Sequence, residues 1–239
     1  MVPTLLTAEI FKTLDYARAR HACVLVQGRT GRGKTEAARA WCAARKNAYY
    51  IDCPPEGGLP ALREAVRAVC SCPAVQDIAD FLAGQKATLV LDECARILPV
   101  RGARAKALEW ARRLHDQARV GLAFVATDFF IREASSGSLG EYLEQFIGRF
   151  RDKFIIPDYV SPQEAADILR PVVPDPADDL VQWAVKVANE PGKGGARRLW
   201  WLLDDAADIA AQRRLPVDLK FLQTVLKDYE GRARMPAKP

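Results

Sequence analysis

The chain has 239 residues, of which 49% are hydrophobic and 27% are charged, with a formal net charge of +5. This length accommodates one large α/β domain, alone or with a smaller second domain, and the composition is typical of a globular protein. No apolar stretch approaches the roughly 18 residues that span a bilayer, and the first residues lack the pattern of a signal peptide. We therefore expect no membrane contact, and six cysteines without paired spacing fit a reduced, cytoplasmic compartment. The mild positive charge permits nucleic-acid binding without establishing it.

An amphipathic helix is expected first, over about residues 7 to 20, and strands then alternate with helices. The expected strands are 22–27, 48–53, 87–92, 120–126 and 153–156. The expected helices between them are 34–45, 58–70, 75–83, 103–118 and 138–148. This alternation predicts an α/β fold in which a parallel sheet has helices on both faces.

A glycine-rich loop follows the first expected strand. The eight residues from Gly28 to Thr35 match G-x-x-x-x-G-K-[ST], the phosphate-binding P-loop, between a strand and a helix as that loop requires. Glycines let the backbone direct N–H groups at phosphate oxygens, and the helix presents its positive dipole end to the same anion. We expect Lys34 to reach the β- and γ-phosphates of ATP and Thr35 to bind Mg²⁺. The residues expected to contact the nucleotide are Gly28, Thr30, Gly31, Arg32, Gly33, Lys34, Thr35 and Glu36.

Two adjacent carboxylates, Asp92 and Glu93, end the third expected strand. At the C-terminal end of a buried parallel strand they would face the crevice where ligands bind. Asp92 is expected to hold Mg²⁺, directly or through water, and Glu93 to polarise an attacking water as general base. A solvated acidic turn is the plainer interpretation. The acidic pair favours hydrolysis over kinase chemistry, because a hydrolase must activate water whereas a kinase must exclude it.

The fourth expected strand ends in Thr127 and Asp128. Either side chain can orient the attacking water beside Glu93, and Asp128 can alternatively cap the helix that follows. We favour Thr127. Before the fifth strand lie Arg149 and Arg151. Arg149 is the preferred candidate for an arginine finger on the γ-phosphate of a neighbouring subunit, ahead of Arg151, and a solvated helix end is the alternative.

From Ser161 the strand pattern stops. Ser161-Pro162-Gln163-Glu164 is a capping box that starts a helix to about residue 169, and further helices are expected at 178–187, 197–213 and 217–229. The predicted domains are an α/β nucleotide-binding domain at 1–158, a helical lid at 159–230 and a basic, disordered tail at 231–239. Arg197, after a glycine pair, is expected to reach the nucleotide from the lid.

The six cysteines show no paired C-x-x-C spacing, and the chain has only two histidines, so zinc is not expected. Cys23, Cys53 and Cys94 lie on or beside expected core strands, where free cysteine behaves as a small hydrophobe.

Together these motifs resemble the AAA+ ATPases over roughly residues 20 to 230. The resemblance implies a five-stranded sheet ordered 5-1-4-3-2, ATP bound between the α/β domain and the lid, and active sites shared between subunits. Within that class the chain looks most like the MuB-type and transposon target-selector ATPases, on its opening Val2-Pro3-Thr4, the helix running into the first strand and the G-x-x-R lid.

That resemblance implies a protein that binds duplex DNA when loaded with ATP, assembles into filaments or rings, and delivers target DNA to a transposase. MuB-type proteins carry an N-terminal helix-turn-helix domain, whereas about 20 residues precede the first expected strand here. DNA contact is therefore expected from the ATPase domain, through Arg101, Arg104 or Lys106 in a basic stretch after the acidic pair. The plainer interpretation of that stretch is a solvated amphipathic helix.

Three other functions remain open. A helicase loader or replication-initiator-like ATPase would share every catalytic residue. A P-loop switch or small-molecule kinase is disfavoured by Glu93 and the arginines of the lid. A signalling ATPase would use the lid to recruit partners without nucleic acid.

Overall fold

The computed structural model of the chain describes residues 4–98, 106–130 and 148–233. Its contacts divide these residues between two compact units. The first unit consists of Thr7–Arg29 and the described residues within Lys34–Ile156, and the second of residues 4–6, Thr30–Gly33 and the described residues from Pro157 onward. Four residues of the glycine-rich loop therefore group with the C-terminal part of the chain.

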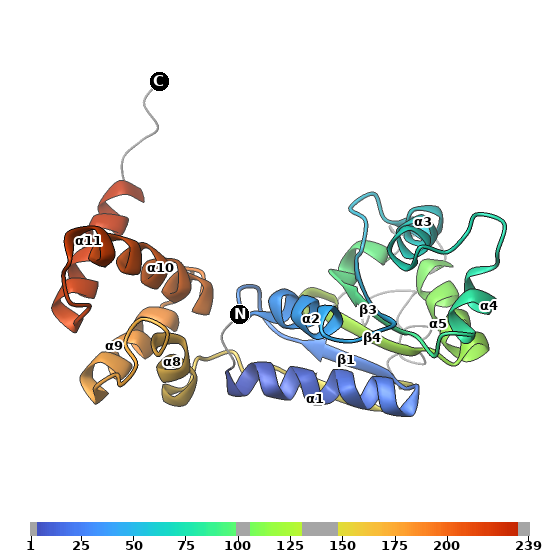
Figure 1. Cartoon of the computed structure of the whole chain (residues 1–239), viewed down its shortest axis with the longest axis horizontal. Coiled ribbons are helices and arrows are strands. Elements are labelled where there is room, and N and C mark those ends of the chain that lie inside the picture. Colours follow the sequence, from blue (N-terminus) through green and yellow to red (C-terminus); the bar gives the residue numbers. More distant parts are fainter. Residues whose placement is uncertain (1–3, 99–105, 131–147, 234–239) are drawn as a thin grey trace, which may run out of the picture. The chain divides into compact units, whose positions relative to one another are not determined.

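The first unit is built on a five-stranded sheet (Figure 1). Every neighbouring pair of strands is parallel, and the order is β2-β3-β4-β1-β5, which confirms the expected order read from the opposite edge. The strands are β1 (Cys23–Gln27), β2 (Ala48–Asp52), β3 (Thr88–Asp92), β4 (Gly121–Ala126) and β5 (Asp152–Ile155).

The three central strands are buried on both faces, as their continuous apolar sequences predict. On one face Leu25, Leu91 and Phe124 join the main core. That core also includes side chains of the helices α3 (Gly58–Cys70), α4 (Ile78–Ala83) and α5 (Lys106–Ala118). The alternate residues of the same strands, such as Val24 and Val90, are equally inaccessible. Both faces of the sheet are therefore covered, which positions the carboxyl ends of the strands as its functional edge.

The first unit also contains two helices that contribute other buried side chains and one short turn of 3-10 helix. Most of α1 (Leu5–Arg20) belongs to this unit and buries Ile10 and Leu14, and α2 (Lys34–Ala43) buries Trp41. The 3-10 helix η1 (Cys94–Ile97) begins directly after Glu93 and was not expected.

Most elements match the expected ones to within a few residues, several boundaries differ, and one expected helix cannot be compared. Helix α4 begins at Ile78 rather than 75, because the Asp77 side chain accepts hydrogen bonds from the N–H groups of Ala79 and Asp80 and so caps the helix there. Strand β5 begins one residue early, at Asp152. The helix expected at 138–148 lies almost entirely outside the described residues.

The second unit is helical, with no strand among its described residues. Its helices are α8 (Pro162–Leu169), α9 (Asp178–Ala188), α10 (Ala196–Arg213) and α11 (Leu219–Ala233). They enclose a separate core that includes Leu169, Leu180, Leu199 and Leu222. Helix α11 ends at Ala233, within the expected tail, and Glu230, the last residue of the expected lid, pairs with the buried Arg198 of α10. No described helix is long and apolar enough to cross a bilayer.

All six cysteines are buried, including the three expected in the core. Burial raises the pKa of Cys23 to about 12, with a smaller contribution from the negative charge of Asp116. Burial likewise raises the pKa of Cys42 to about 12. These thiols therefore stay protonated near neutral pH and act as small apolar side chains.

Gly121, the first residue of β4, provides a test of the sheet packing. A Cβ at this position would lie 2.6 Å from the carbonyl oxygen of Ala17 and 3.2 Å from Cγ2 of Thr88. We expect Gly121→Ala to lower the free energy of unfolding by about 1–3 kcal/mol, because backbone must move to admit the methyl group. Equilibrium urea unfolding followed by circular dichroism measures the change.

Gly84→Ala is the matched control in the same unit. Gly84 has a right-handed φ of −63°, and a Cβ there would meet nothing closer than 3.8 Å. This variant is expected to stay within about 0.5 kcal/mol of the parent. Equal losses in the two variants would contradict the close approach at Gly121.

Candidate nucleotide-binding site

The lysine of the glycine-rich loop is enclosed by the loop's own backbone. Lys34 is the first residue of α2 and is only 7% exposed. Its ammonium donates hydrogen bonds to the carbonyl oxygens of Gly28 at 2.7 Å and Arg29 at 2.9 Å. These two carbonyls fix the position of the positive charge at the point where β1 gives way to α2.

The glycines of the loop adopt backbone conformations that other residues rarely enter. Gly31 has a φ of +85° and Gly33 a φ of +76°. A Cβ at Gly31 would lie 2.8 Å from the carbonyl oxygen of Gly194, and one at Gly28 would lie 2.7 Å from Cβ of Ile156. A loop with this backbone geometry, leading into a helix N-terminus, suits a phosphate group, because its N–H groups can converge on one anion.

Asp92 is the centre of a small hydrogen-bonded cluster at the end of β3. The residue is 2% exposed, and its Oδ2 accepts hydrogen bonds from the hydroxyls of Thr35 at 2.7 Å and Tyr50 at 2.8 Å. Its Oδ1 accepts from the backbone N–H of Glu93 at 2.8 Å. The structure therefore brings together Thr35 and Asp92, the two residues predicted to hold Mg²⁺.

Tyr50 was not predicted to belong to this cluster. It lies on β2, two residues before the strand ends beside Asp92, and that placement follows only from the pairing of β2 with β3. Burial, together with the negative charge of Asp92, raises the pKa of the Tyr50 hydroxyl above its ordinary value, so the hydroxyl stays protonated and donates. The Arg39 guanidinium lies over the ring, 4.9 Å from its centre.

The oxygen ligands of this cluster suit magnesium better than a transition metal. Among the described residues, no group of three or more His, Cys, Asp and Glu side chains could hold a metal ion. Magnesium is commonly bound by one or two protein oxygens together with water and substrate phosphates. A pair such as Thr35 and Asp92, next to a phosphate-binding loop, fits that ion.

Glu93 adopts a strained backbone conformation. Its φ of +54° and ψ of +41° are left-handed, which is uncommon for a residue with a side chain. Its side chain is half-buried, and within the described part of the chain its carboxylate has no hydrogen-bond or ion-pair partner. A carboxylate in this setting is available to accept a proton from water.

The ends of β1 and β4 place two further polar side chains together. Gln27 Nε2 donates a hydrogen bond to Asp128 Oδ1 at 3.2 Å, and the strand register sets Gln27 opposite Ala126. Sequence reasoning missed Gln27, because the expected strand order does not give the register that sets Gln27 beside the end of β4. Thr127 is half-buried, and its carbonyl accepts from the Phe130 N–H at 3.0 Å. The choice of Thr127 over Asp128 stays a prediction.

The predicted arginines differ in their surroundings. Arg149 has a side chain that is 54% exposed and lies 3.6 Å from Asp116, while Arg151 is also exposed. Arg197 is exposed and stacks on Trp201, with 5.9 Å between the guanidinium and the ring centre. Its Cβ would lie 3.4 Å from a Cβ built at Gly31. The structure therefore places Arg197 next to the tip of the glycine-rich loop.

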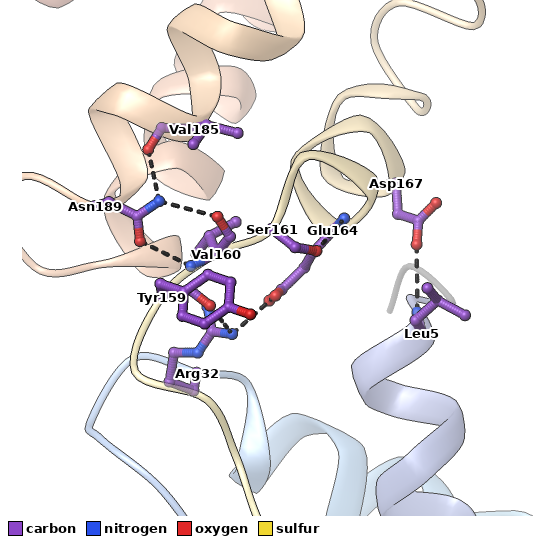
Figure 2. Close-up of polar contacts among 9 residues, drawn as sticks. All are labelled: Leu5, Arg32, Tyr159, Val160, Ser161, Glu164, Asp167, Val185 and Asn189. Carbon is purple, nitrogen blue, oxygen red and sulfur yellow. Dashed lines mark hydrogen bonds and ion pairs between the residues drawn. The ribbon is translucent and has the colours of Figure 1, made fainter.

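The remaining residues predicted to contact DNA or nucleotide differ in whether they are described and in how exposed they are. Arg101 and Arg104 lie outside the described residues, and Lys106 is an exposed residue at the start of α5. Arg32 was predicted to contact the nucleotide, but its side chain is buried and bonds Glu164 and the Tyr159 carbonyl (Figure 2). The contact of Arg32 with the nucleotide stays a prediction.

The parallel sheet of this order, with a P-loop after β1 and an acidic pair after β3, has the fold of the AAA+ class of P-loop ATPases. In sequence, the chain is similar to the Mu-like prophage FluMu DNA transposition protein B of Haemophilus influenzae. The two are 27% identical over 138 residues, a match that covers 53% of this chain and 45% of that protein. The match therefore spans less than half of that relative. No family model matches the chain.

Solved structures resemble the chain over most of its length. The Aeropyrum pernix Orc1 protein in complex with DNA superposes with a TM-score of 0.61 at 19% identity, covering 94% of this chain and 64% of that one. Domain III of the Thermotoga maritima replication initiation protein DnaA gives 0.60 at 13% identity, covering 95% and 94% respectively. At these identities the likeness is one of fold.

The hydrogen bond from Tyr50 to Asp92 leads to a prediction about stability. Tyr50→Phe removes a donor from a buried carboxylate, and a hydrogen bond to a charged group contributes about 1.5–3 kcal/mol. We expect a loss of that size in the free energy of urea unfolding. The control is Tyr49→Phe, which removes a hydroxyl bonded to the neutral Gln85 side chain, where about 1 kcal/mol is expected. A smaller loss for Tyr50 than for Tyr49 would contradict the assigned role of the cluster in stability.

Proposed function

We propose that this chain is an ATP-hydrolysing, largely sequence-nonspecific DNA-binding protein that oligomerises on duplex DNA and delivers target DNA to a transposase or activates it. The observation that carries the nucleotide part is the contact between Thr35 and Asp92 beside the loop that holds Lys34. The similarity to a prophage DNA transposition protein supports the DNA part. The activity and partners of that longer relative come to this chain only as part of this proposal.

The residues divide the chemistry between binding and water activation. The loop N–H groups and Lys34 bind the phosphates of ATP, and Thr35 and Asp92 hold Mg²⁺. Magnesium, when bound, neutralises charge on the phosphates. Glu93 accepts the proton of the attacking water, and Thr127 orients that water, with Asp128 as the alternative.

Assembly supplies the remaining positive charge. The exposed Arg149 guanidinium can reach a neighbouring subunit, where it would stabilise charge on the transferred phosphoryl group. Arg197, beside Gly31, would contact the nucleotide within its own chain. ATP bound in this way would therefore favour a filament or ring, and Arg149 would serve turnover more than nucleotide affinity.

The proposed DNA contacts follow from which basic side chains of α5 form ion pairs with acidic side chains and which do not. Arg112 pairs with Asp116 at 2.9 Å, and Arg113 pairs with Glu109 at 2.7 Å. Lys106 at the start of the helix has no such acidic partner among the described residues. We therefore assign phosphate contacts to Lys106 and to Arg101 and Arg104, which precede it in the sequence.

A replication-initiator-like or helicase-loading function would use the same catalytic residues. The likeness to Orc1 and DnaA is one of fold, whereas the sequence similarity is to a transposition protein, and this favours the first function. Binding to a purified transposase rather than a replicative helicase would separate the two.

Nucleotide-dependent DNA binding tests the proposal directly. With a non-hydrolysable ATP analogue and Mg²⁺, the chain is expected to bind duplex DNA of arbitrary sequence, and electron microscopy should show filaments or rings. Lys34→Ala should lose both nucleotide and DNA binding, because it removes the ammonium held by the loop. Lys106→Ala should bind nucleotide normally while the log–log salt slope of DNA binding falls by about 0.9. DNA binding that is indifferent to nucleotide would refute the coupling.

Glu93→Gln separates hydrolysis from binding. The substitution removes the proton acceptor and leaves the phosphate-binding residues intact, so ATP turnover should fall by about 10²–10⁴-fold while ATP affinity stays within about twofold. The variant should therefore accumulate as an ATP-bound assembly on DNA, visible as slower dissociation of labelled DNA. Glu109→Gln, on the exposed face of α5, is the control and should hydrolyse ATP at the parent rate. Undiminished turnover by Glu93→Gln would move the general base elsewhere.

A further inference from the structure

We propose that Glu164 is a positioning residue of the phosphate-binding loop. It holds the side chain of Arg32 and thereby preorganises the backbone between Gly31 and Gly33 for a phosphate. This inference rests on the proposed nucleotide-binding function. It assigns a role in nucleotide affinity to a residue of α8, far from the loop in sequence.

The pair is a buried one. Arg32 Nη2 lies 2.8 Å from Glu164 Oε2, and the two side chains are 3% and 10% exposed. The same nitrogen donates to the Tyr159 carbonyl at 3.2 Å (Figure 2). Both residues belong to the second compact unit. Since water scarcely reaches this pair, each charge depends on the other for compensation.

The remaining donors of Arg32 increase that dependence. Its Nε and Nη1 are buried and have no hydrogen-bond partner among the described residues. The Tyr159 carbonyl offers a dipole but no charge, so the Glu164 carboxylate is what offsets the cost of burying the guanidinium. Without that carboxylate, we expect the Arg32 side chain to move toward water and the backbone between Gly31 and Gly33 to shift with it.

Glu164 is itself held firmly at the start of α8. Its backbone N–H donates to the Ser161 hydroxyl at 3.2 Å, which caps the helix. The preceding Val160 exchanges two hydrogen bonds with the Asn189 side chain, at 2.7 and 2.9 Å, and Asn189 also donates to the Val185 carbonyl (Figure 2). In a capping box the glutamate usually turns back to the first residue. Here it pairs with Arg32 instead.

The effect on the loop follows from the residues on either side of Arg32. Gly31 and Gly33 both have positive φ and, as glycines, lose more conformational entropy on ordering than other residues. Anchoring the side chain between them restricts the backbone before a phosphate binds. Only molecules whose loop already has the binding conformation can bind phosphate. The apparent dissociation constant equals the intrinsic one divided by the fraction of such molecules, so it rises as that fraction falls.

The experiment measures nucleotide affinity on the full chain. Glu164→Gln keeps the size of the side chain and removes its charge, and a fluorescent ATP analogue with Mg²⁺ reports the dissociation constant. We expect an increase of about tenfold, corresponding to a tenfold smaller competent fraction. Glu230→Gln is a control for a general disturbance of the helices, since it withdraws one of the two carboxylates that pair with the buried Arg198 in the same unit and leaves Glu190. Its affinity should stay within twofold of the parent.

A double-mutant cycle with Arg32→Met tests whether Glu164 acts through Arg32. If it does, Glu164→Gln has no further effect on affinity in the Arg32→Met background. Equal effects in both backgrounds, or an equal loss in Glu230→Gln, would show a general disturbance of the helices and overturn the inference. Glu164→Asp, which keeps the charge and shortens the reach, replaces Glu164→Gln if the latter does not fold.

The outcomes separate this inference from the function on which it rests. Failure of the parent chain to bind the analogue would overturn the proposed function and this inference with it. Binding by the parent, with unchanged affinity in a folded Glu164→Gln or Glu164→Asp variant, would overturn the role of Glu164 alone.

Discussion

The buried carboxylate of Asp92 is the constraint on which the site depends. A charge that is 2% exposed persists only where donors surround it, and here they come from α2, from β2 and from the next backbone N–H. These donors belong to segments that are separate in sequence. Satisfying one carboxylate therefore fixes the start of α2 against the end of β3, and the proposed magnesium-nucleotide site rests on that arrangement.

The parallel sheet makes this arrangement possible. Because every strand runs in the same direction, Gln27, Asp52, Asp92 and Ala126 all lie at one edge. Polar side chains gather at that edge, whereas the interiors of β1, β3 and β4 are apolar. The residues of the site and the residues of the core therefore occupy largely separate positions. The strained Glu93 backbone lies at that edge as well, where a left-handed residue leads directly into η1.

The glycine-rich loop is restrained at two of its residues. Lys34 is fixed by the carbonyls of Gly28 and Arg29, within the first unit, and Arg32 is fixed by Glu164, within the second. A glycine-rich loop gains its shape from backbone freedom, and that freedom must be restrained for the loop to bind tightly. A buried ion pair is a suitable restraint, because it loses much of its stability when either partner moves.

Sequence alone determined the order of strands and helices, the P-loop, the acidic pair and the class of fold, because these depend on local patterns of apolar, glycine and charged residues. It also predicted that Thr35 and Asp92 hold the same Mg²⁺ ion, because Mg²⁺ prefers oxygen ligands of this kind. Only the tertiary structure revealed Tyr50 beside Asp92, Gln27 beside Asp128 and the turn of Arg32 toward Glu164. Each of these contacts joins residues far apart in the chain. Strand register and helix packing decide which distant side chains meet, and neither can be derived from the spacing of residues along the chain.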